Sequence, residues 1–271
     1  MKISNFLKWT LGLVLVSQLQ LSAQEADENP EYVGDNFSLE AALEVFKNSD
    51  NIEDFEKKLN EEKQSVNNLD LDENGETDYI SVESMMEGDN HNVVLFTFVG
   101  DNDRQDIAVI EIEKTGAEEA VLQILGDEAL YADNTIVEPV DVSEQGEKGQ
   151  GPAIENAPVR IVVNVWTWRP IRFIFSPGYR VWVSPYKWRV YPKWWKPWKP
   201  VHYKLFHTRC APHRVVYHRT TVHRVVRAHK VYHPHRKSST VVVKHGRKTT
   251  VVHKNKKGNV KTKTVKHGKR K

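Results

Sequence analysis

Two short helices are predicted where the chain first shows a regular apolar pattern. Ser38 is a good helix cap, and apolar residues recur after it at i, i+3, i+4 and i+7. These residues are Leu39, Ala42, Leu43 and Phe46. Asp50 or Asn51 can cap a second helix, whose apolar residues also share one face. Those residues are Ile52, Phe55 and Leu59. Each helix therefore has one face suited to a core.

Four runs typical of β-strands follow the helices, and short polar turns separate them. The runs cover residues 79–84, 92–99, 106–113 and 120–125. The turns between them contain the sequences GDN, GDN and KTG. Two helices on a four-stranded antiparallel meander make a small α+β domain over residues 36–142. One helical layer on one face of the sheet would bury the apolar positions.

The pattern changes after this domain. Residues 143–158 have the composition of a linker. A Trp-rich segment, defined here as residues 159–200, is basic and rich in Pro. A short β-hairpin is predicted inside it, with its turn at Arg169-Pro170.

A basic, His-rich tail of low complexity covers residues 201–271. A five-residue repeat begins at His213, His218 and His223, and its period matches neither a helix nor a strand. Because such a repeat presents no amphipathic face, we expect the chain beyond about residue 205 to be largely disordered, or to form only marginal β-hairpins in its last thirty residues.

The chain begins with the features of a secretory signal peptide over residues 1–23. Lys2 and Lys8 form the positive start, an apolar run follows, and Ala23 precedes the expected cleavage point. That run is shorter than the roughly 20 apolar residues that span a bilayer, which disfavours an uncleaved membrane anchor. An acidic lead-in of residues 24–35 follows. We therefore expect an exported protein that is periplasmic, associated with the cell envelope, or secreted.

Charge is segregated between the two halves of the chain. Residues 25–155 hold all 36 Asp and Glu with seven Lys and Arg, a formal charge of −29. Residues 158–271 hold 30 Lys and Arg and no acidic residue. Such asymmetry is typical of an interaction tail attached to a separate domain. The acidic domain is also a candidate partner of the tail, which it would mask until salt or a stronger polyanion competes.

The sequence DLDENGETD at residues 70–78 resembles a calcium-binding loop. Gly75 stands at position 6 of the loop, where a sharp turn needs glycine, and oxygen ligands recur at alternate positions. The expected ligands are Asp70, Asp72, Asn74, the carbonyl of Glu76, and Asp78. Position 12 is Ser81 rather than the bidentate Glu of an EF-hand, so a weak, EF-hand-like calcium site is predicted. The alternative is an acidic turn that leads into a strand without an ion.

Tryptophans and cations are interleaved between residues 166 and 198, where seven of the eight Trp lie. This mixture suits three anionic targets, which are lipid headgroups, single-stranded nucleic acid and an anionic polysaccharide. No motif that reads a nucleic-acid sequence accompanies it. The alternative is a small β core, which the prolines near residue 200 disfavour there. The expected contact residues are Trp188, Lys193, Trp194, Trp195, Lys196, Trp198 and Lys199.

Other chemistry-bearing residues are few. His229, His233 and His235 lie close enough along the tail to suggest a metal site, and the alternative is a solvated polycation. Cys210 is the only cysteine and is expected as a free surface thiol. The acidic domain contains one histidine, His91, without a cysteine or a Gly-rich phosphate loop. We therefore expect a protein that is not an enzyme.

Several stretches of the chain resemble an uncharacterised family of exported bacterial proteins. They are FSLEAALEVFKNS, VNNLDLDENGETDYISV, QDIAVIEIEK, VLQILGDEALY and the later NVWTWRPIRFIFSPGYRVWVSPYKWRVYPKWWKPW. The resemblance covers most of the mature chain. It implies the α+β architecture, the D-x-D-x-N-G-x-x-D-Y-I loop and a Trp-rich basic C-terminal half, and it implies no particular activity.

The sequence as a whole favours a non-enzymatic, exported binding protein. Its acidic domain would hold the calcium-type loop, and its polycationic Trp-rich extension would bind anionic envelope polymers such as lipopolysaccharide, or lipid headgroups. Two alternatives are a self-neutralising structural or assembly protein of the envelope and a His-rich protein that binds metal or haem.

Overall fold

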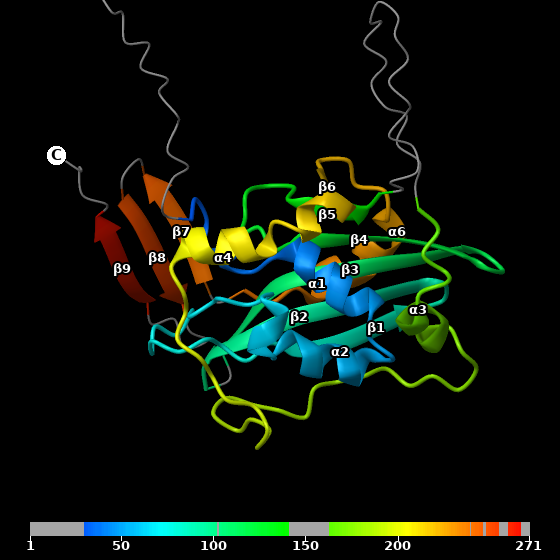
Figure 1. Ribbon diagram of the computed structural model, residues 1–271, viewed down its shortest axis with the longest axis horizontal. Coiled ribbons are helices and arrows are strands. Elements are labelled where there is room, and N and C mark those ends of the chain that lie inside the picture. The colour runs from blue at the N-terminus through cyan, green and yellow to red at the C-terminus, as the bar shows by residue number, and fades with distance from the viewer. Residues whose placement is uncertain are drawn as a thin grey trace, which may run out of the picture.

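The computed structural model describes residues 30–101, 103–140 and 163–238 (Figure 1). It also describes the backbone of three later strands, which pair in the order β7-β8-β9 as a second antiparallel sheet. These strands are Thr240–His245 (β7), Lys248–Lys254 (β8) and Val260–Lys266 (β9). The predicted signal peptide, most of the acidic lead-in and the predicted linker lie outside the described residues.

The two predicted helices are confirmed. Helix α1 covers Leu39–Lys47, and the Ser38 hydroxyl caps it by accepting from the Ala41 amide at 3.1 Å. Helix α2 covers Ile52–Leu59, and the Asn51 side chain caps it by accepting from the Asp54 amide at 2.8 Å. Two short 3₁₀ turns flank this helical pair, η1 at Val33–Asn36 and η2 at Glu62–Gln64. Local capping and apolar spacing thus determine both helices.

The main sheet has six antiparallel strands in the order β1-β2-β3-β4-β5-β6, two more than the predicted meander. The four predicted strands are β1 to β4, and β5 and β6 extend the sheet beyond β4. The bounds are Ser81–Glu87 (β1), Asn90–Gly100 (β2), Asp103–Gly116 (β3), Glu119–Gly126 (β4), Ile136–Pro139 (β5) and Tyr217–Thr220 (β6). The last strand comes from the basic half, so both halves of the chain share one sheet. The α+β class is therefore confirmed, although the predicted four-stranded sheet is too small.

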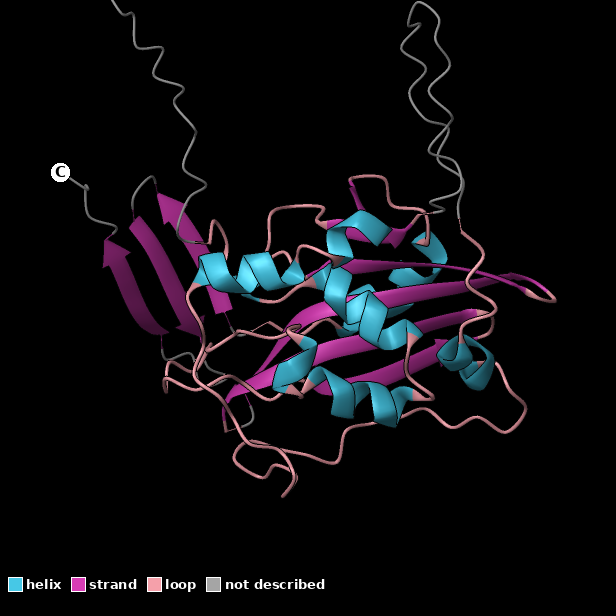
Figure 2. Cartoon of the chain, in the orientation of Figure 1, coloured by secondary structure: helices cyan, strands magenta, loops and turns pink. Residues whose placement is uncertain are grey.

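The main core lies between the helices and one face of the sheet (Figure 2). Helix α3, Arg169–Ile174, joins α1 and α2 there and buries Ile171 and Ile174. The predicted hairpin with its turn at Arg169-Pro170 is therefore wrong. Proline fits the first turn of a helix because no intrahelical partner is lost at that position, and Pro170 stands there in α3.

The Trp-rich segment lies along the free edge of β1 and is mostly loop. The Ser84 amide donates to the Trp182 carbonyl at 2.7 Å, and the Ser184 amide donates to the Val82 carbonyl at 2.9 Å. These bonds satisfy edge groups that would otherwise be open to another strand. Single bridges replace the predicted short Trp-rich β segment, because the prolines of this segment cannot donate to a β-ladder.

The basic residues that follow are folded, so the predicted disorder beyond about residue 205 is wrong for residues 205–238. This stretch forms Tyr203–Cys210 (α4), His213–Val216 (α5), β6, Val226–Tyr232 (α6) and His233–His235 (η4). Helix α6 packs on the sheet face opposite α1 and α2, where Tyr232 contacts Val94 and Val109 in a small second core. Cys210 is buried, not at the surface as expected. This stretch folds because its Arg and His side chains pair with carboxylates of the sheet, which the repeat pattern alone does not reveal.

No helix among the described residues has both the length and the apolar character needed to cross a membrane.

Candidate functional site

Aromatic side chains of the Trp-rich segment gather around Tyr79, which is buried just before β1. Four rings lie with centroids 5.2 to 6.4 Å from the Tyr79 ring: Tyr186, Tyr191, Trp194 and Trp195. Edge-to-face and offset arrangements of this kind stabilise aromatic clusters. The cluster fixes this part of the segment against the domain.

A buried carboxylate anchors the same segment. Glu56 of α2 accepts from the Trp182 indole at 2.8 Å and from the Ser184 hydroxyl at 2.7 Å. It also accepts from the Tyr79 hydroxyl at 2.9 Å and the Val82 amide at 3.2 Å. Burial raises the pKa of the Glu56 carboxyl above its ordinary value, and these four donors oppose that shift. The loop is thus attached by hydrogen bonds as well as by rings.

The outer side of the Trp-rich segment carries cations and apolar side chains together, and we call it the aromatic–cationic surface. Its exposed cations are Arg172, Arg180, Lys187, Arg189, Lys193, Lys196 and Lys199. Its exposed apolar side chains are Phe173, Val181, Val183, Val190 and Trp194. Within the described part of the chain, none of the seven cations forms an ion pair. Their charges are therefore available to a partner.

The predicted contact residues divide into two groups on this surface. Lys193, Trp194, Lys196 and Lys199 are exposed. The remaining three are half-buried, and they are Trp188, Trp195 and Trp198. The Trp195 indole nitrogen lies inside the fold, without a hydrogen-bond partner among the described residues. Most of the indoles are therefore turned toward the protein, while the lysines face outward.

The acidic loop forms the predicted turn. Gly75 has a φ of 86°, and its amide and the Asn74 amide donate to the Asp70 carboxylate, both at 3.0 Å. Asp72 accepts from the Asn74 amide at 3.1 Å, and the buried Asp78 accepts from the Leu71 amide at 2.6 Å. Burial raises the pKa of the Asp78 carboxyl well above its ordinary value.

The loop also touches the Trp-rich segment. The Thr77 amide donates to the Trp198 carbonyl at 2.8 Å, and the Trp198 amide donates to the Thr77 hydroxyl at 3.3 Å. The carboxylates of Asp70, Asp72 and Asp78 do not converge as a three-residue group in the described structure. Calcium binding at this loop stays a prediction.

Four buried carboxylates of the acidic half pair with arginines of residues 217–238, which we call the basic segment. The pairs are Glu40 with Arg219 (2.7 Å), Glu113 with Arg227 (2.8 Å), Asp127 with Arg236 (2.6 Å) and Glu138 with Arg224 (3.2 Å). Burial alone would raise the pKa of Glu40, but the Arg219 guanidinium outweighs it and lowers that pKa. These contacts, which we call the seam, join the two oppositely charged halves.

A different group of side chains meets at Glu111 of β3, on the same side of the sheet as α6. One Glu111 oxygen lies 2.7 Å from Nε2 of His223, and the other lies 2.7 Å from Nδ1 of His229. The two imidazole centroids are 4.7 Å apart, and His233 lies 5.3 Å beyond His229. The hydrogen bond with Glu111 raises the pKa of His229, although burial opposes the shift. Among the described residues, Glu111, His223 and His229 are the one such group whose atoms could hold a metal ion.

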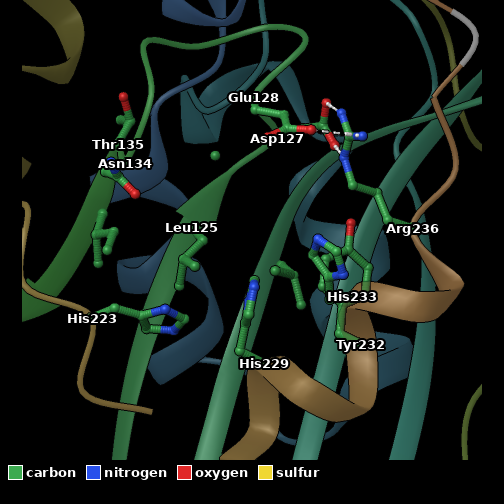
Figure 3. A pocket seen from close by; sticks show the side chains of 13 residues that line it. Leu125, Asp127, Glu128, Asn134, Thr135, His223, His229, Tyr232, His233 and Arg236 are labelled. Carbon is green, nitrogen blue, oxygen red and sulfur yellow. Dashed lines mark hydrogen bonds and ion pairs between the residues drawn. The ribbon is translucent and has the colours of Figure 1, made fainter. Parts of the chain in front are cut away.

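A cavity of about 180 Å³ lies beside this group (Figure 3). His223, His229 and His233 line one part of it, and the Asp127–Arg236 pair lines another. A small molecule or water can therefore reach the imidazoles from this side.

The sequence predicts only part of this cluster. The predicted metal residues are His229, His233 and His235, whereas the structure joins His229 to His223 and to Glu111, and His235 is not part of the described group. His223 is not predicted as a ligand because it stands in a five-residue repeat whose period matches neither a helix nor a strand. Glu111 alternates with apolar neighbours on β3, which is typical of a solvent-facing strand position. Only the folded basic segment makes that position buried.

Comparison with known protein families, with curated proteins and with solved structures finds no match to this chain.

Proposed function

We propose that this protein is an exported binding protein, without catalytic activity, that attaches to anionic lipid headgroups through the aromatic–cationic surface. The observation that carries the proposal is a set of seven exposed cations, without an ion pair among the described residues, together with five exposed apolar side chains on the anchored Trp-rich segment. A lipid interface accepts both kinds of side chain, because phosphates attract the cations and the acyl boundary accepts the apolar groups.

The orientation of the rings favours lipid over a polymer. Nucleic acids and polysaccharides bind to aromatic platforms whose faces are open for stacking. Here Trp188, Trp195 and Trp198 are half-buried, and Trp194 is the exposed Trp of the contact set. The other exposed apolar groups include aliphatic side chains, which have no face for a base or a sugar. An anionic envelope polymer is therefore the competing ligand in the test.

Calcium at the acidic loop would stabilise the end of the Trp-rich segment. Thr77 of the loop is hydrogen-bonded to Trp198, so an ion that orders residues 70–78 would also order the end of the Trp-rich segment. We expect calcium to raise the melting temperature of the mature chain and Asp78→Ala to remove that rise. An equal rise in the two proteins would place calcium elsewhere.

The lipid proposal is tested by sedimentation of the mature chain with neutral and with anionic phospholipid vesicles. Each Lys near an anionic membrane contributes about 1 kcal/mol, so K193A/K196A/K199A is expected to weaken binding on the order of 100-fold. The matched control K204A/R209A/K230A removes three exposed cations elsewhere and changes the net charge equally.

Two results would count against attachment to lipid. If the control weakens binding as much as the first variant, only net charge matters. If heparin binds as tightly as anionic vesicles and W194A affects neither, the ligand is an anionic polymer and the apolar side chains have no part in binding.

A further inference from the structure

We propose that Glu111, His223 and His229 bind one divalent transition-metal ion of the zinc class, which fastens the basic segment to the sheet. This metal site is independent of the lipid-binding function, because its residues lie on β3, on α6 and in the loop before α6 rather than on the Trp-rich segment.

The donor atoms suit such an ion. Two imidazole nitrogens and a carboxylate oxygen form a donor set that zinc, copper and nickel accept, whereas calcium and magnesium prefer oxygen ligands. Zinc lies about 2.0–2.2 Å from such ligands, so tetrahedral ligand atoms are roughly 3.4 Å apart. The present N···O distances at Glu111 are 2.7 Å, and the three donor groups lie within 4.8 Å of one another. A displacement of less than about 1 Å, with loss of the shared protons, admits the ion.

Glu111 differs from the four carboxylates of the seam in the residues that it contacts. Glu40, Glu113, Asp127 and Glu138 each pair with an arginine, which is a permanent cation and not a metal ligand. Glu111 has two histidines instead. A single arginine would balance one carboxylate fully, so ion pairing alone does not account for two imidazoles at this position. Two imidazoles beside one carboxylate are instead a ligand set that an ion of the zinc class accepts.

Helix α6 holds His229 in place before any ion binds. The Glu113 carboxylate accepts from the Arg227 amide at 2.7 Å and the Ala228 amide at 3.2 Å, and so caps the helix. The Asn92 side chain donates to the Ala228 carbonyl at 2.9 Å. Because strands β2 and β3 carry Asn92, Glu111 and Glu113 on one face, His229 is fixed relative to Glu111.

His223 is held by a second set of contacts. Gln123 of β4 lies opposite Glu111 in the strand register. Its side chain donates to the Val222 carbonyl at 2.9 Å and accepts from the Arg224 amide at 2.8 Å. The residues on both sides of His223 are thus fixed to the sheet, and supporting contacts of this kind raise the affinity of metal sites.

The cavity provides the remaining coordination position. It lies next to His223 and His229, and the exposed His233 stands on its rim (Figure 3). Zinc held by three protein groups takes water as its fourth ligand, and a cavity of about 180 Å³ has room for water. A rotation of His233 would instead close the site with a third imidazole.

The test is titration of the chelator-treated mature chain with zinc alone, followed by calorimetry and by melting temperature. We expect one zinc per chain, a higher melting temperature and no effect of calcium at this site. Loss of supporting contacts costs metal sites 10- to 100-fold in affinity, so loss of a direct ligand in His229→Gln or Glu111→Gln is expected to cost about 100-fold or more. His235→Gln, which changes an exposed histidine on the same segment, is expected to bind as wild type.

Cobalt provides a measurement on the unaltered chain. The visible spectrum of bound Co²⁺ distinguishes a tetrahedral site with nitrogen and oxygen ligands from loose binding to exposed histidines. The proposal is overturned if the wild-type chain binds no zinc, or if His229→Gln binds it as tightly as wild type. If His229→Gln loses its fold by circular dichroism, the cobalt spectrum of the wild type decides, and a spectrum without tetrahedral bands overturns the proposal.

Discussion

The single histidine of the acidic half makes the fold sensitive to acid. His91 on β2 is fully buried, and neither ring nitrogen has a hydrogen-bond partner among the described residues. The rings of Phe175 and Tyr179 lie against it, with centroids 6.3 and 5.4 Å away. Burial lowers the pKa of His91 from 6.5 to about 4, because the imidazolium would lie in an apolar site without a partner.

The size of the effect follows from this shift. A lowered pKa in the folded state means that the unfolded chain binds a proton first, so stability is lost as the pH falls from about 6.5 toward 4. A difference of one pKa unit corresponds to about 1.4 kcal/mol. Between pH 7 and pH 5, His91 should therefore reduce the free energy of unfolding by about 2 kcal/mol, and by about 3 kcal/mol once the pH is below 4.

The assay is urea denaturation of wild type and His91→Phe at pH 7 and pH 5. Phenylalanine keeps a ring between Phe175 and Tyr179 and cannot titrate. The wild type should lose about 2 kcal/mol more than the variant between the two pH values. His202→Phe, at an exposed position, serves as the control and should behave as wild type. Equal losses in wild type and His91→Phe would refute the reasoning.

Three further predictions concern the seam, the core and the thiol. Arg236→Ala leaves the buried Asp127 without its two-pronged partner and should cost about 3 kcal/mol in urea denaturation, part of which Asp127→Asn should restore. Gly126→Ala would place a Cβ 2.5 Å from the Tyr131 ring and should cost roughly 1–3 kcal/mol by the same measurement, whereas an unchanged midpoint would contradict the packing. Burial raises the pKa of Cys210 to about 11, so a thiol reagent should label the native chain far more slowly than the urea-unfolded chain.

The elements that could be predicted from sequence are those that local pattern determines. Ser38 and Asn51 cap the first two helices as expected, and the alternation of apolar residues gives strands β1 to β4. Strand β5 has only four residues, and it is a strand because it pairs with β4 and β6. Its local sequence is too short to predict this. Helix α3 has six residues and is stabilised by burial of Ile171 and Ile174 rather than by periodicity.

The candidate metal site, Glu111 with His223 and His229, could not be predicted from the sequence because it too depends on contacts between distant segments. Glu111 and Glu113 occupy the strand positions that alternate with the core, and such positions usually face water. Their burial depends on a segment more than 100 residues later in the chain. The segregated charge indicated that the two halves attract each other, but charge alone does not specify which carboxylate meets which cation. The strand register and the caps of α6 do so.

The basic half uses arginines in the seam and mainly lysines on the aromatic–cationic surface, so the two regions should respond differently to salt. In the seam the paired cations are Arg219, Arg224, Arg227 and Arg236, and arginine suits buried pairs because its planar fork matches a carboxylate and it is weakly hydrated. Four of the seven exposed cations on the aromatic–cationic surface are lysines, whose hydrated charges suit a wet anionic partner. The carboxylates of these pairs are buried, and partly buried pairs are screened by salt less than fully exposed charges. Vesicle binding should therefore fall steeply as salt rises, while the near-ultraviolet circular dichroism of the fold stays unchanged. If both signals change together, salt is opening the seam, and the fall in binding would report loss of the fold rather than screening of the aromatic–cationic surface.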